Sequence, residues 1–319
     1  MRVGIPRALL YYWYGPAWKT LLTETGHVPV VSAPTNKAIM NRGLKAAVDE
    51  ICLPVKVFIG HILSLQENCD AVLVPRLTSI ARKEYICPKF MGLPDMVRRV
   101  LKGTPVLTWK NEGNFLPKLS ALPREFFAHR SRREAKRAIK KAEEVYNAYT
   151  ALLYRGYLPQ EAEEVLAGIR EEKTRRTKDA VIGIVGHPYC IYDSFVNIGL
   201  LQFLHEEGRR VMTPEMVTEE QISSALKGLP KPLYWTMGKK ILGAARVFRQ
   251  AGAGGLIHVA AFACGPEALI GELVKRESKD WKIPFLQLYL DEHSGEAGLH
   301  TRLEAFLDLT GGKEHVGCI

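Results

Sequence analysis

The sequence lacks any apolar run near the roughly 20 residues that a membrane-spanning helix needs. Its first residues, MRVGIPRALLYYWYG, also lack the long apolar core and the small-residue cleavage site of a signal peptide. The six cysteines are scattered along 319 residues, so they do not form the dense framework of a disulfide-stapled secreted domain. We therefore expect a cytoplasmic protein without membrane contacts.

Several common functional motifs are missing as well. The absence of GxSxG, HExxH and EF-hand patterns weakens hypotheses of hydrolase activity and calcium binding. The segment GIVGHP follows a strand pattern and precedes a helix pattern, but the chain has neither a three-glycine fingerprint nor a Walker sequence. Nucleotide binding by this chain is therefore only weakly supported.

Positive charge is in excess, with a formal net charge of +10. Much of this excess lies in RSRREAKRAIKK, residues 130–141, where it recurs along one expected helix. A solvated basic face is the favoured interpretation, and docking of an acidic protein or an anionic cofactor is the alternative. No nucleic-acid partner is expected.

The length and the alternation of short apolar runs with helical patterns predict an α/β fold with two lobes. An N-terminal Rossmann-like lobe is expected over residues 1–122, and a C-terminal Rossmann-like lobe over residues 179–319. Residues 123–178 show only charged helical patterns and are expected to form a helical connector. Runs such as LIHVAAF are apolar on both faces, which is typical of buried strands in parallel sheets.

Four cysteines fall beside expected helix starts: Cys52, Cys87, Cys190 and Cys264. Ligands of open parallel sheets bind at the carboxyl ends of the strands, so we expect these thiols to share one site. Thiolates are soft ligands for iron–sulfur clusters and for zinc, and the spacing alone does not choose between the two. For any one of these cysteines, a small buried apolar residue is the simpler alternative.

Other candidate residues are weaker. His187 and Tyr189 flank Cys190, and we expect them to contact a cofactor or substrate, with ordinary loop packing as an equal alternative. Cys69 and Cys318 are expected to be structural or incidental. The charges in LDEHSGEAGLHTRLEAFLD are better explained by capping and ion pairs of an amphipathic helix than by an acid–base or metal site.

Five segments together resemble the acyl-CoA dehydratase activase-related proteins, relatives of the iron–sulfur subunits of 2-hydroxyacyl-CoA dehydratases and benzoyl-CoA reductases: ICLPVKVFIGH, VPRLTSIARKEYICPKFMGLPD, GHPYCIYD, FACGPEAL and DEHSGEAGLHTRLEAFLD. The resemblance implies a [4Fe-4S] cluster in the cleft between the lobes, bound by Cys52, Cys87 and Cys264. Cys190 has no counterpart in the dehydratase subunits, so it is either a fourth ligand or no ligand. Double-cubane cluster proteins are also relatives, so a larger cluster stays an alternative.

The function that this resemblance implies is low-potential electron transfer or reduction under anaerobic conditions, with the cluster reduced by a separate ATP-dependent activase. One alternative is an acyl-CoA dehydratase or reductase subunit that binds its substrate at an open cluster iron. A second alternative is a non-catalytic cluster scaffold that docks through the basic helix. No catalytic residue is assigned, and enzymatic activity, the small-molecule substrate and a homodimeric state are left open.

Overall fold

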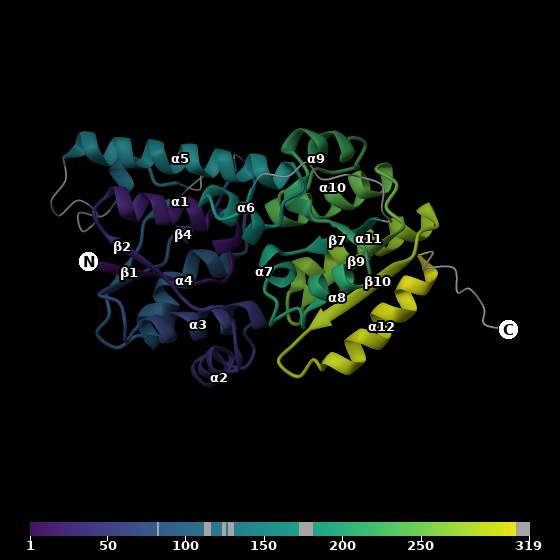
Figure 1. Cartoon of the computed structure of the whole chain (residues 1–319), viewed down its shortest axis with the longest axis horizontal. Coiled ribbons are helices and arrows are strands. Elements are labelled where there is room, and N and C mark those ends of the chain that lie inside the picture. The colour runs from purple at the N-terminus through teal and green to yellow at the C-terminus, as the bar shows by residue number, and fades with distance from the viewer. Residues whose placement is uncertain (82, 112–115, 123–125, 127–130, 172–180, 311–319) are drawn as a thin grey trace. The chain divides into compact units, whose positions relative to one another are not determined.

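The computed structural model describes residues 1–319 except 82, 112–115, 123–125, 127–130, 172–180 and 311–319. The chain divides into two compact units, drawn from purple to teal and from teal to yellow in Figure 1. Unit 1 contains residues 1–174 and 230–237, and unit 2 contains residues 175–229 and 238–319. Each unit is built on its own parallel sheet, so we describe them separately.

The sheet of unit 1 has four parallel strands in the order β2-β1-β3-β5. These strands are β1 (Arg2–Ile5), β2 (Val28–Val31), β3 (Ala71–Leu73) and β5 (Val106–Leu107). Two further short strands, β4 (Arg76–Leu77) and β6 (Lys110–Asn111), pair in parallel. The buried strands β1 and β3 form the switch point of this sheet, where the strand order reverses.

Among the described residues, six α-helices accompany this sheet: α1 (Tyr11–Glu24), α2 (Lys37–Ala46), α3 (Leu53–Leu65), α4 (Pro88–Val100), α5 (Arg132–Tyr154) and α6 (Pro159–Leu166). A 3₁₀ turn lies at Leu119–Ala121. Figure 1 shows α5 running along α1. The hydroxyl of Tyr149 on α5 donates a hydrogen bond to the backbone oxygen of Tyr12 on α1, at 2.8 Å. The helices that we expected between the lobes thus pack within unit 1.

Helices α2 and α3 cross with their backbones almost in contact. A Cβ atom built on Gly60 of α3 would lie 2.1 Å from the carbonyl oxygen of Ile39 on α2. A Cβ atom on Gly43 of α2 would lie 2.0 Å from the carbonyl oxygen of Lys56 on α3. Only glycine fits at these two positions, so these glycines allow α2 and α3 to pack closely against each other.

The sheet of unit 2 has four parallel strands in the order β10-β9-β7-β8. They are β7 (Val181–Gly186), β8 (Arg210–Met212), β9 (Gly255–Ala261) and β10 (Phe285–Leu290). The two sheets have the same topology: numbered by their order along the chain, the four strands of each sheet lie side by side as 2-1-3-4. In unit 2 the switch point lies between the fully buried strands β7 and β9. The predicted α/β class with two Rossmann-like lobes and parallel sheets is confirmed.

In the part of unit 2 that the structure describes, six α-helices are found: α7 (Pro188–Ile191), α8 (Leu200–Glu206), α9 (Glu219–Ala225), α10 (Thr236–Gln250), α11 (Gly265–Trp281) and α12 (Glu296–Leu309). A 3₁₀ turn lies at Pro214–Met216. The segment before α10 groups with unit 1, because Tyr85 and Trp235 form a parallel bridge there. Tyr85 donates its N–H to the oxygen of Tyr234 and accepts from the N–H of Thr236.

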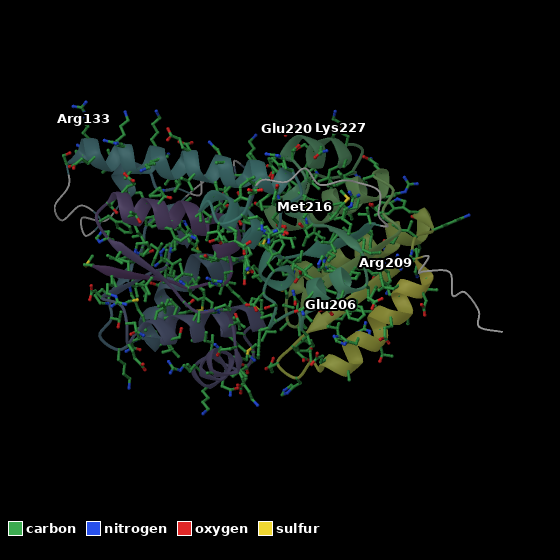
Figure 2. All side chains as sticks on the ribbon, viewed as in Figure 1. Arg133, Glu206, Arg209, Met216, Glu220 and Lys227 are labelled. Carbon is green, nitrogen blue, oxygen red and sulfur yellow. The ribbon has the colours of Figure 1, made fainter. Side chains whose placement is uncertain are left out.

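The basic helix α5 begins with a capping box, in which Ser131 and Glu134 satisfy each other's backbone N–H groups. Its charged side chains face outward, and Figure 2 shows Arg133 extending away from the ribbon. Small alanines occupy much of its buried face. Among the described residues, no helix combines the length and the apolar character that crossing a bilayer requires.

Candidate functional site

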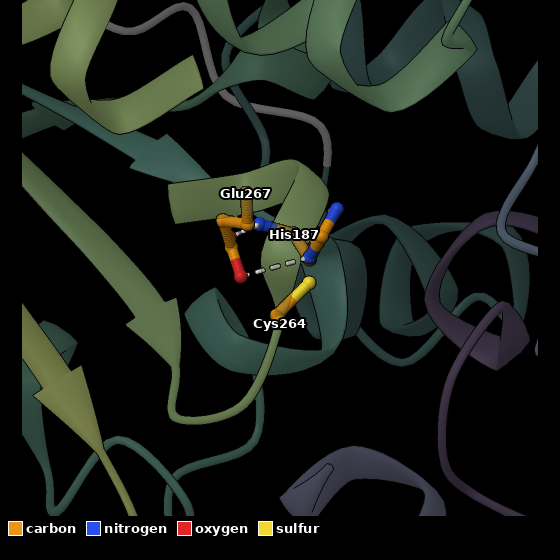
Figure 3. A group of neighbouring side chains, drawn as sticks. All are labelled: His187, Cys264 and Glu267. Carbon is orange, nitrogen blue, oxygen red and sulfur yellow. Dashed lines mark hydrogen bonds and ion pairs between the residues drawn. The ribbon is translucent and has the colours of Figure 1, made fainter. Parts of the chain in front are cut away.

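The switch point of unit 2 brings together three side chains from two neighbouring strand ends. His187 follows β7 directly, Cys264 lies three residues after β9, and Glu267 lies in the first turn of α11. Their ligand atoms all lie within 4.8 Å of one another. Figure 3 shows the three side chains gathered at this point. Within the described part of the chain, this is the one group of three His, Cys, Asp or Glu side chains that is close enough to hold a metal ion.

Glu267 ties the ends of both strands together. It is 1 % exposed, and its Oε1 accepts the backbone N–H of His187 at 3.1 Å. Its Oε2 accepts the backbone N–H of Ala261, the last residue of β9, also at 3.1 Å. The same Oε2 lies 3.0 Å from Nδ1 of the His187 ring, as an ion pair whose alignment is poor for a hydrogen bond. One carboxylate therefore fixes both the backbone and the ring of His187.

The charges of this group support each other. Burial favours the neutral imidazole of His187, but the charge of the nearby Glu267 carboxylate outweighs it and raises the pKa of His187 to about 10. Burial likewise favours the protonated form of Glu267, but the His187 cation outweighs it and lowers the pKa of that carboxyl. The two pKa shifts have opposite signs, so each partner favours the charged form of the other.

The backbone around the group is constrained at two points. Gly186 has φ 155°, and a Cβ atom there would lie 2.3 Å from the carbonyl oxygen of Val259, so only glycine brings His187 this close to β9. Ala263 has φ 64°, a region that costs a side-chain-bearing residue energy. This sharp turn ends the strand segment and places the half-buried Cys264 at the N-cap of α11.

The two predicted thiols of unit 1 also begin helices. Cys52 is the N-cap of α3 and Cys87 is the N-cap of α4. Together with Cys264 they share a pattern: a proline follows at the first or second helical position, and the thiol makes no capping hydrogen bond. Cys52 departs from our expectation in one respect, because it lies between α2 and α3 and not directly after a strand.

The other predicted residues of the site lie around α7. Tyr189 stacks on the ring of His187, with centroids 5.0 Å apart and an angle of 29° between the planes. Cys190 is fully buried inside the single turn of α7, where its N–H donates to the oxygen of His187. Cys69 lies against Gly4 in unit 1, and Cys318 lies outside the described residues.

The sequence analysis did not identify Glu267 as part of the site. This residue lies three residues after Cys264, where a carboxylate suits the first turn of a helix. We expected side chains of the acidic C-terminal segment to cap its helix, but the N-cap of α12 is Gly295, and no side chain caps the helix. Asp291 Oδ1 instead accepts hydrogen bonds from the N–H of His293 and the hydroxyl of Ser294, both at 2.9 Å, in the turn before α12.

Comparison with protein families adds one finding. Residues 2–217 match a family model described as "CoA enzyme activase uncharacterised domain (DUF2229)". The match spans the first segment of unit 1, up to residue 174, and the first two strands of unit 2. It therefore includes Cys52, Cys87 and His187 and ends before Cys264. No curated protein matches the chain.

Proposed function

We propose that this chain, which belongs to the DUF2229 family of CoA enzyme activase domains, is an iron–sulfur protein that handles low-potential electrons in an acyl-CoA dehydratase system. In this proposal Cys52, Cys87 and Cys264 bind one [4Fe-4S] cluster. A separate ATP-hydrolysing activase reduces the cluster, which then passes the electron to a small substrate or acceptor.

The observation that carries the proposal is the common placement of the three thiols. Each begins a helix, each precedes a proline, and none caps its helix with the sulfur. A cysteine is a poor choice for an N-cap, because Ser, Thr, Asn and Asp accept hydrogen bonds from the first-turn N–H groups far better. Thiolates at helix N-termini gain from the positive end of the helix dipole, and this setting suits ligands of an iron–sulfur cluster.

The donor set fits such a cluster, since three soft thiolates leave the fourth iron position open for water or for a substrate oxygen. We leave Cys190 out of the set because it is 0 % exposed inside α7, whereas Cys52 is 8 % exposed at the start of α3 and Cys87 and Cys264 are half-buried. The proposal requires both units to supply thiols to one cluster. When bound, the cluster supplies one-electron chemistry, and the protein supplies ligands, charge and exclusion of water.

The family description itself favours one alternative, in which the chain is an ATP-hydrolysing activase. Against it stands the absence of a Walker sequence and of a three-glycine fingerprint. The two functions differ in a simple measurement, because an activase hydrolyses ATP by itself, and the proposed electron carrier does so only through its partner.

Anaerobic reconstitution tests the proposal. We expect about four iron and four sulfide per chain, the composition of a [4Fe-4S] cluster. Cys52→Ala, Cys87→Ala and Cys264→Ala should each lose most of this iron, whereas Cys69→Ala and Cys190→Ala should keep it. Reconstituted protein without iron and sulfide would refute the proposal, as would full loading of Cys264→Ala. ATP hydrolysis by the isolated chain would favour the activase alternative.

A further inference from the structure

The first turns of α5 carry four exposed cations on one side of the helix, which we call the basic stripe: Arg132, Arg133, Lys136 and Arg137. We propose that the basic stripe docks an acidic surface of another protein. The stripe lies outside the proposed iron–sulfur site, because α5 contains no cysteine, so its role does not depend on the proposed function.

The basic stripe differs from a charged helix face in unit 2. In α11, Lys275 and Arg276 both pair with Glu272, one turn earlier on the same helix. Within the described residues, no ion pair joins a residue of the stripe to a carboxylate, and the ion pairs of α5 begin only further on, at Lys140 and Lys141. The positive charge of the stripe is therefore available to a partner.

The stripe also opposes the electrostatics of its own helix. Arg132 and Arg133 occupy the first turn, where the positive end of the helix dipole favours acidic side chains. Arg132 and Lys136, like Arg133 and Arg137, are four residues apart, and like charges at this spacing destabilise a helix. Sequences depart from local consistency mainly at functional sites, so unpaired cations that disturb their own helix indicate a surface kept for a partner.

Helix α5 holds the stripe on a fixed support. The capping box of Ser131 and Glu134 secures the helix start directly before the stripe. Three alanines are buried on the opposite side of these turns: Ala135, Ala138 and Ala142. The cations therefore face solvent, and Figure 2 shows Arg133 extending away from the ribbon. A surface held in this way needs little ordering on binding, and its charge accelerates the encounter with an acidic partner.

The charge pattern of α5 favours a protein partner over a membrane or a nucleic acid. An interfacial helix inserts apolar side chains into the bilayer, whereas the apolar side of these turns is already buried. An extended phosphate backbone that follows the helix would meet the exposed carboxylates of Glu143 and Glu144, which repel it. A protein can end its acidic patch at this point, so a protein surface fits the change of charge along α5.

Charge reversal tests the docking surface. The probe is a fluorescently labelled poly-L-glutamate peptide, and its binding to the full chain is followed by fluorescence anisotropy at roughly 0.1 M salt, where surface charges interact over about 10 Å. We expect the double variant Arg133→Glu, Arg137→Glu to bind at least about tenfold more weakly than wild type. Equal binding by wild type and this variant overturns the inference.

The double variant Lys227→Glu, Lys231→Glu is the matched control. Both lysines are exposed and lie outside the helices, and the two reversals change the net charge by the same amount as those in the stripe. This control should bind the peptide within about twofold of wild type. If it loses as much affinity as the stripe variant, the peptide senses only the net charge, and the inference is wrong.

Two further probes distinguish the possible occupants of the stripe: a DNA duplex and vesicles that contain phosphatidylserine. Weaker binding of both than of the peptide supports an acidic protein partner. If either binds wild type more tightly than the peptide and loses this binding in the stripe variant, the stripe serves a nucleic acid or a membrane, and the proposal of a protein partner is overturned.

Thermal unfolding of the free protein is a readout that needs no probe. Arg133→Glu places an acid in the first turn and turns the repulsion from Arg137 into attraction, so Tm should rise by about 1–2 °C. Lys227→Glu should leave Tm unchanged. An equal or lower Tm in Arg133→Glu would mean that the arginine does not disturb its own helix, and the stripe would then need no partner to explain it.

Discussion

In unit 1, Cys52 and Cys87 begin helices that pack on apolar neighbours, whereas in unit 2 Cys264 begins α11 beside a buried ion pair. The strand order is the same in both sheets, so the fold alone does not produce the difference. The difference comes from the residues after the central strands: β7 ends in Gly186 and leads into His187, and α11 carries Glu267 in its first turn. Equivalent topology delivers a thiol to the sheet edge, and neighbouring residues set its electrostatics.

The two units also hold the starts of these helices in place by different kinds of contact. Unit 1 holds α3 by a close backbone crossing at Gly43 and Gly60, where van der Waals contact does the positioning. Unit 2 holds the start of α11 by charge and hydrogen bonds from Glu267 to β7 and β9. Removing one such contact in each unit should therefore change the free energy of unfolding by different amounts and in different parts of the chain.

The largest effect is expected for Glu267→Ala. The change leaves the His187 cation buried without its partner and two backbone N–H groups without acceptors, which should cost about 3–5 kcal/mol of the free energy of unfolding. Urea unfolding gives the total, and hydrogen exchange of peptides from β9 and α11 shows whether the loss falls in unit 2.

Glu277→Ala on the same helix is the control for that prediction. Glu277 pairs with Arg246 at the surface, with both side chains about a fifth exposed, so its loss should cost about 1 kcal/mol or less. If the two variants lose the same stability, or if unit 1 peptides exchange faster in Glu267→Ala, the contrast that we draw between the units is wrong.

A smaller effect is expected from Gly60→Ala in unit 1. The added methyl group would meet the backbone of Ile39, which cannot rotate aside, so the overpacked crossing should cost about 1–3 kcal/mol. Gly92→Ala on α4 is the matched change, because nothing lies within 4 Å of its Cβ position. There the loss of backbone freedom in the unfolded chain should stabilise the protein by about 0.5–1 kcal/mol.

Thermal unfolding of both glycine variants, with exchange of peptides from α3, measures these effects. If Gly60→Ala and Gly92→Ala lose the same stability, the close crossing of α2 and α3 is not what excludes a side chain at Gly60. A Gly60→Ala protein that unfolds normally but no longer loads iron would instead show that the crossing serves mainly to place Cys52.

Much of the architecture could be predicted from the sequence, because buried parallel strands such as β7 and β9 are continuous apolar runs. The sequence gives little local signal for the strand β1 and the helix α2. β1 has four residues, including Gly4, so it carries little periodic signal, and α2 mixes polar residues with the glycine that its close crossing requires. In both cases the tertiary contact decides the structure, and the local pattern does not.

The candidate site in unit 2 could also be predicted only in part from the sequence. His187 and Cys264 could be proposed as candidates because each follows a strand-like run. Glu267 could not be singled out, since its partners are a ring nitrogen and two backbone N–H groups that only the pairing of β7 with β9 brings together. The sequence predicts that thiols gather at strand ends, and it does not predict which of them lies beside a buried histidine and carboxylate.

The smallest effect separates structural from functional reasons for cysteine at the helix starts. In Cys52→Ser the hydroxyl accepts a first-turn N–H that the sulfur leaves uncapped, so the cluster-free protein should gain about 0.5–1 kcal/mol of stability. Ser131→Ala removes an existing cap from α5 and should lose about 1 kcal/mol. Urea unfolding of the metal-free variants measures both. A gain in stability together with lost iron loading would mean that selection retains Cys52 against the capping preference of its own helix. If Cys52→Ser instead loses stability without iron, the thiol is kept for packing, and the case for cysteine ligands in unit 1 weakens.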